Sequence, residues 1–113
     1  MLHPVQIYRG DTWVRVWTIA VDGVALNLTG ASAALHVRSR AEDALTVFEA
    51  TTAVDGGLTI TEPTAGVIGL HKSTAALPVG RYIFDLEITL ADGTVQTYEQ
   101  NYLIVRQDVT RIS

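Results

Sequence analysis

The stretch Gly80–Arg106 constrains the fold most, because it has the pattern of two long β-strands joined by a tight turn. From Tyr82 to Leu90, large apolar residues alternate with mostly polar ones, and this period of two is typical of a strand with one buried face. Asp92-Gly93 supplies the turn, since glycine tolerates a positive φ and aspartate can bond its own backbone. A second β-rich run, Thr94–Arg106, follows. The sequence therefore predicts a long antiparallel hairpin in an all-β domain.

Composition supports this class and excludes several others. Thr, Val and Ile make up 35 of the 113 residues, and such β-branched side chains favour strands. The length fits one domain, residues 1–113, with terminal segments 1–4 and 107–113. A net charge of −4 argues against nucleic-acid or polybasic membrane contact. With no cysteine, no disulfide scaffold or thiolate metal site is expected, and we see neither a membrane span nor a signal peptide.

Short strand patterns separated by turn residues predict an immunoglobulin-like antiparallel β-sandwich of about seven to nine strands. Tyr82 follows a Pro/Gly corner, which is the position of a tyrosine corner; an ordinary core aromatic is the alternative. A short helical turn is expected near 73–77, because Ser73 can cap it and Pro78 can end it. The remaining strands are expected at Val5–Tyr8, Thr12–Val21, Val24–Leu28, Ser32–Arg40, Leu45–Thr51, Leu58–Glu62 and Val67–His71.

The sequence offers little for catalysis or metal binding. His3, His36 and His71 do not have the close spacing of metal ligands. Asp85 and Glu87 share one strand face, and a solvated face with a cross-strand ion pair to an arginine explains them better than acid–base chemistry does. We therefore predict no enzyme, no catalytic residue, no metal site and no cofactor.

Two smaller motifs also have structural explanations. Arg9-Gly10-Asp11 is expected to form a turn between two strands rather than a receptor-binding loop. Asn27-Leu28-Thr29 is a formal glycosylation sequon that is expected to be unused, because no signal peptide is visible. Neither motif therefore points to a function.

Aromatic and arginine side chains are the remaining candidates for a functional surface. Trp13, Arg15 and Trp17 share one face of a strand, where they form either part of the core or an exposed contact for a partner. Tyr98 and Tyr102 are predicted to share a face of the last strand. These five residues are the candidate protein interface.

Three turn or corner motifs carry a resemblance that covers the chain from Tyr8 to Arg111. They read LTG at 28–30, ALPVGRY at 76–82 and DGT at 92–94. With the RGDTW segment at 9–13, they resemble small structural proteins of tailed bacteriophages and prophages. In that family an immunoglobulin-like sandwich is similar to the N-terminal domain of baseplate upper proteins.

The resemblance implies a non-enzymatic virion protein, made in the host cytoplasm, that assembles in several copies with other virion proteins. Its expected place is the tail, the baseplate or the fibre attachment. Capsid decoration or a head fibre is the alternative, and a carbohydrate-binding module is an alternative of another class. The module would need an exposed aromatic platform, for which Trp13 and Trp17 are the same-face tryptophan pair.

Overall fold

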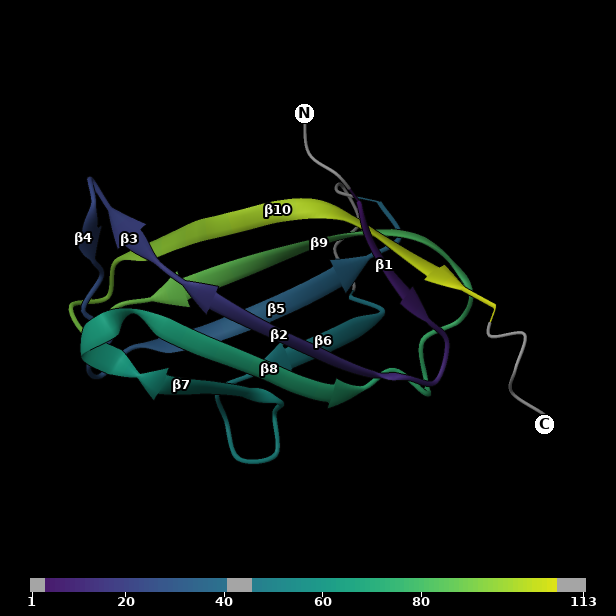
Figure 1. The fold of residues 1–113 in the computed structure, drawn as a ribbon, viewed down its shortest axis with the longest axis horizontal. Coiled ribbons are helices and arrows are strands. Elements are labelled where there is room, and N and C mark those ends of the chain that lie inside the picture. The colour runs from purple at the N-terminus through teal and green to yellow at the C-terminus, as the bar shows by residue number, and fades with distance from the viewer. Residues whose placement is uncertain (1–3, 41–45, 108–113) are drawn as a thin grey trace.

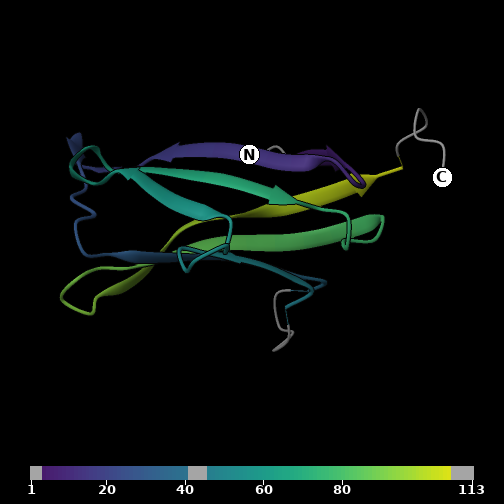
Figure 2. The same cartoon turned by 90° about the horizontal axis from the view of Figure 1, so that it is seen from below.

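Two β-sheets pack face to face in the computed structural model, which describes residues 4–40 and 46–107 (Figures 1 and 2). The strands are β1 (Val5–Tyr8), β2 (Thr12–Thr18), β3 (Ala20–Val21), β4 (Val24–Ala25), β5 (Ser32–Arg38), β6 (Phe48–Thr51), β7 (Leu58–Glu62), β8 (Val67–Ser73), β9 (Gly80–Thr89) and β10 (Val95–Arg106). Among the described residues, the one helix is the 3-10 turn η1 (Pro63–Ala65). The predicted all-β, immunoglobulin-like sandwich is thus confirmed.

The strands divide into one wide and one narrow sheet. The five-stranded sheet has the order β1-β10-β9-β5-β6, and the three-stranded sheet has the order β2-β8-β7. A small separate hairpin is formed by β3 and β4. All neighbouring pairs are antiparallel except β1 and β10, which run parallel. The first strand therefore lies beside the last one, in a different sheet from β2.

The core lies between the two sheets and is built from the inward side of each strand. On β9, every second residue from Tyr82 to Ile88 is buried, as the alternating pattern predicts. Trp13 of β2 reaches across to the facing sheet, where its ring makes an edge contact with Phe84 at 5.5 Å and a tilted one with Phe48 at 6.3 Å. Aromatic pairs with this geometry stabilise a core beyond the area that they bury.

The tyrosine corner is confirmed at the start of β9. The Tyr82 hydroxyl donates a 2.7 Å hydrogen bond to the backbone carbonyl of Pro78, and burial raises the pKa of this phenol. At the far end of the hairpin, the Asp92 carboxylate accepts a 2.9 Å bond from the Thr94 amide. That bond lowers the pKa of Asp92, and Gly93 takes φ of 93° beside it. The chemistry of both turns is as the sequence predicts.

The connection between β8 and β9 differs from the prediction. No helix forms over 73–77, because Ser73 is the last residue of β8 and pairs with Thr12; the chain makes a single turn there, in which the Leu77 amide donates to the Thr74 carbonyl at 2.9 Å. Thr74 then fixes the chain with two hydrogen bonds to the carbonyl of Asp11. Its hydroxyl donates one of 2.6 Å, and its amide donates one of 3.2 Å. The Ser73 hydroxyl oxygen accepts a 3.2 Å bond from the Ala75 amide, so the local cap signal is present, but the pairing with β2 limits it to one turn.

Several other boundaries are shorter than expected. The predicted strand Thr12–Val21 divides into β2 and β3, and the strand predicted from Val24 ends at Ala25. The start of the strand predicted at Leu45 and most of the two terminal segments lie outside the described residues.

We expect Tyr82→Phe to lower the free energy of unfolding by about 1–2 kcal/mol, because the Pro78 carbonyl loses its hydrogen bond. Urea denaturation monitored by tryptophan fluorescence measures this. Tyr102→Phe is the matched control, since Tyr102 is 47% exposed and its loss should cost under about 0.5 kcal/mol. Equal effects of the two substitutions would show that the corner bond contributes nothing particular.

The raised pKa of Tyr82 also predicts a loss of stability at alkaline pH. The unfolded phenol ionises near its ordinary pKa of 10.0, whereas the folded one keeps its proton to higher pH. The folded state then binds more protons, so the free energy of unfolding falls as pH rises above 10. Denaturation between about pH 8 and pH 11 should show a steeper decline for the wild type than for Tyr82→Phe. Parallel pH profiles would contradict this.

Candidate functional site

The most unusual side-chain arrangement lies on β2, which alternates strictly between the two faces of its sheet. Trp13 and Trp17 turn inward and are 4% and 9% exposed, with Arg15 between them on the same side. The predicted shared face is confirmed, and it is the core side rather than a surface. The burial of these two tryptophans supports core packing over an exposed contact for a partner.

Arg15 reaches inward to a carboxylate on the opposite sheet. Its Nη2 lies 2.8 Å from Oε2 of Glu99 on β10, and Oε1 of the same carboxylate accepts a 2.6 Å bond from the Trp17 indole. The guanidinium also lies over the rings of Trp17 and Phe84, at 5.0 and 5.8 Å. Charge-assisted bonds of this kind are stronger than neutral ones, so Glu99 joins the two sheets at the middle of β2.

A bulge in β10 is what aims Glu99 inward. The pairing with β9 shifts between Thr97 and Glu99, and one extra residue on a strand transfers those that follow to the other face. Glu99 then shares the inward side with the buried Leu103 and Val105. The sequence analysis missed this contact. Regular alternation along the strand does not show the bulge, and without the bulge it does not show that the Glu99 side chain points inward.

The outward side of β2 carries two valines that the fold leaves uncovered. Val14 is 62% and Val16 is 64% exposed. Val14 pairs with His71 and Val16 with Gly69 on β8, so the valine at 16 has no cross-strand side chain beside it. Apart from Glu62 at one end, the outward residues of this sheet carry no carboxylate, lysine or arginine. They are Thr12, Val14, Val16, Thr18, Thr59, Thr61, Val67, Gly69, His71 and Ser73.

The backbone of β2 is unpaired along one edge. At one end of β2, the Asp11 carbonyl accepts a hydrogen bond from the Thr74 amide, and at the other end the Ile19 amide donates one to the Gly66 carbonyl. Both bonds are directed toward the β8 side. In an antiparallel pair the bonding direction alternates, so the odd-numbered residues between them also bond β8. The amides and carbonyls of the even-numbered residues therefore point away from β8, where the described residues place no strand.

The other sheet edges are short or irregular. Both β1 and β6 have four residues, and β7 has a bulge between Ile60 and Glu62. Short edge strands and bulges are common protection against unwanted pairing. Among the described strands, β2 is thus the long and regular edge, and its seven residues include no proline.

The outward face of the five-stranded sheet is different, because charged side chains pair across its strands. His36 on β5 lies between Glu49 on β6, at 2.9 Å, and Asp85 on β9, at 4.0 Å. Arg38 lies 3.6 Å from Asp85. The predicted cross-strand ion pair of Asp85 with an arginine is confirmed, and its partner is Arg38. Charges are therefore concentrated on one outer face and nearly missing from the other.

The two candidate tyrosines do not lie in equivalent places. Tyr102 is 47% exposed, and the guanidinium of Arg81 stacks on its ring at 4.5 Å. Tyr98, at the bulge, packs partly against the core, with its hydroxyl bonded to the Gln96 side chain. Their predicted common face is lost at the bulge, and any contact of either residue with a partner stays a prediction.

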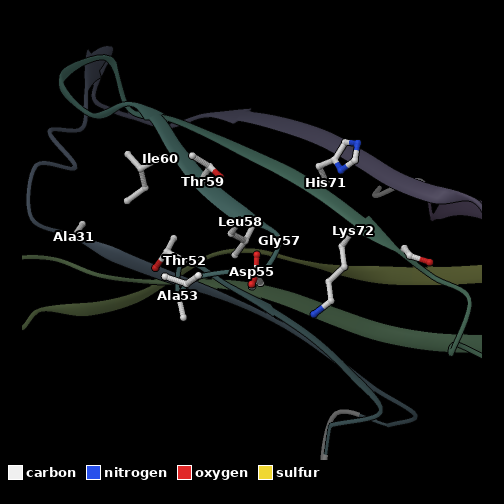
Figure 3. Close-up of a pocket in the computed structure, with 13 residues that line it drawn as sticks. Ala31, Thr52, Ala53, Asp55, Gly57, Leu58, Thr59, Ile60, His71 and Lys72 are labelled. Atoms are coloured by element: carbon white, nitrogen blue, oxygen red, sulfur yellow. The ribbon is translucent and has the colours of Figure 1, made fainter.

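An open hollow of about 820 Å³ lies beside β7 and the loop that precedes it (Figure 3). His71 and Lys72 leave β8 on opposite sides there (Figure 3). The Lys72 ammonium is already engaged, with the Glu49 carbonyl and over the Phe48 ring at 5.4 Å. With Asp55 as its one carboxylate and no nucleophile–base pair in its lining, the hollow offers no catalytic constellation.

The described residues offer neither a metal site nor a membrane-spanning helix. Within 4–40 and 46–107, no three histidine, aspartate or glutamate side chains are grouped so that they would hold a metal ion. His3 lies outside these ranges. No helix there is long and apolar enough to cross a membrane.

Comparison with known proteins identifies the fold but no family. No family profile matches the chain, and no curated protein matches it. Among solved structures, the chain is similar to CopC from Methylosinus trichosporium OB3b, with a TM-score of 0.52 and 12% identity. The match covers 92% of this chain and 84% of CopC. At this identity the likeness concerns the fold alone.

The predicted role as a structural protein of a bacteriophage virion is overturned by this match, because the fold is shared with CopC and no comparison leads to a virion protein. The capsid alternative falls with it. The carbohydrate module lacks its platform, since Trp13 and Trp17 are buried. The family resemblance, the virion location and the predicted partners stay predictions.

We expect Glu99→Ala to lower the free energy of unfolding by at least about 2 kcal/mol, because it leaves the Arg15 guanidinium and the Trp17 indole without their acceptor. Glu49→Ala is the control: its side chain is 51% exposed, and its ion pair should contribute less than about 1 kcal/mol. Chemical denaturation of the three proteins measures both effects. A smaller loss for Glu99→Ala than for Glu49→Ala would contradict the role of Glu99 as the link between the sheets.

Proposed function

We propose that this chain is a non-catalytic protein-binding domain, which takes an extended segment of another protein chain onto the free edge of β2. The observation that carries the proposal is the combination of unpaired backbone groups and two exposed valines on one seven-residue strand. Strand addition uses both features, because main-chain hydrogen bonds give affinity and alternate side chains give specificity.

The topology supports this position for an added strand. In constant-type immunoglobulin domains one sheet has four strands, and its first strand lies beside the second. Here the first strand, β1, pairs with β10 in the other sheet. The place beside β2 is therefore without a strand among the described residues, and the sheet to which β2 belongs has three strands.

The chemistry of the edge suits an uncharged, β-branched segment. Arg15 is turned inward and neutralised by Glu99, so no charge on β2 opposes the approach of a second strand. An added strand would bring side chains beside Val14 and Val16, and apolar surface removed from water contributes roughly 25 cal/mol per Å². Pairs of β-branched residues across strands add further stability.

A proline scan of the edge tests the proposal directly. The Val16 amide points toward the open edge, so Val16→Pro removes a donor for an added strand and no hydrogen bond to β8. Short unstructured peptides selected from a display library on the wild-type chain should protect the Val14 and Val16 amides from hydrogen exchange. They should bind Val16→Pro at least about tenfold more weakly, a loss of about 1.4 kcal/mol.

The matched control is Val24→Pro, at another exposed valine in the small β3–β4 hairpin. It should bind the selected peptides as tightly as the wild type does. Selection of no peptide, or of peptides that bind Val16→Pro unchanged or protect amides elsewhere, would refute binding at the β2 edge.

A further inference from the structure

The sequence of β2 is a palindrome. Thr12 to Thr18 read T-W-V-R-V-W-T, with Arg15 at the centre. Nothing within the fold requires this symmetry, because among the described residues β2 pairs on one side only, with the unrelated residues of β8. A palindromic strand has one special property: turned through 180° about its centre, it presents the same side chains to its own copy.

We propose that the strand taken up by this edge is β2 of a second copy, paired antiparallel about a two-fold axis that passes through Arg15. This inference rests on the proposed function and names its partner. In an isologous contact each surface patch meets itself, which is the symmetry that the palindrome supplies.

The direction of the backbone groups fits this register. At the free edge, the amides and carbonyls of the even-numbered residues of β2 point outward. An antiparallel pair must therefore place even-numbered residues of one copy opposite even-numbered residues of the other. Centring on Arg15 sets Thr12 opposite Thr18 of the second copy and Val14 opposite Val16, and each pair occurs twice. Four such pairs give up to about eight inter-strand hydrogen bonds. All seven residues of the strand are then used.

Identical side chains meet on the outward face. The valine pairs form an apolar cluster at the middle of the joint sheet, and the threonine pairs lie at its two ends. Cross-strand contacts of both kinds stabilise antiparallel sheets. The two narrow sheets join into one continuous six-stranded sheet, since each contributes the order β2-β8-β7.

The two arginines at the axis are the one repulsive element, because like charges opposite one another destabilise a sheet. Each arginine, however, already has its own Glu99 at 2.8 Å and two aromatic rings. Its Nη1 is buried with no hydrogen-bond partner among the described residues. Because this nitrogen is covered by its own chain and the Glu99 carboxylate lies 2.8 Å from Nη2, each arginine comes to the axis with its charge balanced within its own copy.

Sedimentation equilibrium over a wide range of concentration tests the pairing. The wild type should show a reversible monomer–dimer equilibrium. In Val14→Lys/Val16→Lys the dissociation constant should rise at least about tenfold, because four ammonium groups meet across the axis. The matched control, Val21→Lys/Val24→Lys, changes two valines that are 48% and 69% exposed and should leave the equilibrium as in the wild type. Equal weakening by both variants would overturn the proposal.

A disulfide experiment checks the register even where the lysine variant fails to fold. The chain has no cysteine, so Val14→Cys and Val16→Cys each carry one thiol. In the proposed register these positions lie opposite one another with Cα atoms about 5.5 Å apart, within the range for a disulfide. Oxidising an equal mixture should give the mixed disulfide well above the twofold excess over either homodimer that random pairing produces. A statistical mixture would refute the axis at Arg15.

The same measurements separate this inference from the proposed function. A wild type that stays monomeric, while selected peptides still protect the Val14 and Val16 amides, would overturn the second copy as partner and leave strand addition standing. A monomer that also selects no peptide would overturn both. A dimer that Val14→Lys/Val16→Lys does not weaken would place self-association on another surface.

Discussion

The parallel pairing of β1 with β10 determines what the rest of the surface can do. By lying beside the last strand, β1 completes the five-stranded sheet and leaves β2 as the border of the three-stranded one. The turn between them is sharp: Gly10 takes φ of 91°, and the Asp11 amide bonds the Tyr8 carbonyl at 3.0 Å. The Arg9-Gly10-Asp11 motif therefore acts as a crossover between sheets, as expected of a structural turn. The position of β2 at the edge of its sheet follows from this crossover.

The sequence predicted those features that depend on local chemistry. Alternation identified β9 and its buried side, and the turn residues located Asp92-Gly93 and the corner at Tyr82, because these signals involve neighbouring residues only. Sheet membership could not be predicted in the same way. The contact of β1 with β10 joins residues about a hundred positions apart, such as Val5 and Leu103, and no local pattern records it. The turn predicted at 73–77 does not extend into a helix for a similar reason, since Thr74 is fixed by the distant Asp11.

The candidate site shows the same division between local pattern and tertiary context. The shared face of Trp13, Arg15 and Trp17 was predictable, because residues two apart on a strand point the same way. Whether that face met solvent or core depended on the facing sheet and on the direction of Glu99, which a one-residue bulge reverses. Partly burying an arginine between sheets, here with 29% of its side chain exposed, is favourable only when its charge is satisfied. The carboxylate at 99 meets that requirement, and as a result β2 keeps both a charge-free outer surface and a regular backbone.

These constraints act together at the middle of β2. An arginine that faced outward at position 15 would repel a second copy and protect the edge, as charged residues commonly do on edge strands. Facing inward, it is held by Glu99 and two aromatic rings, and the outer surface is left to Val14 and Val16. Removing Glu99 would therefore affect more than the link between the sheets, because the two arginines at a two-fold axis would lose their counter-charges. The stability of the sandwich and the pairing of its edge thus depend on one carboxylate, whose inward direction is set by the bulge in β10.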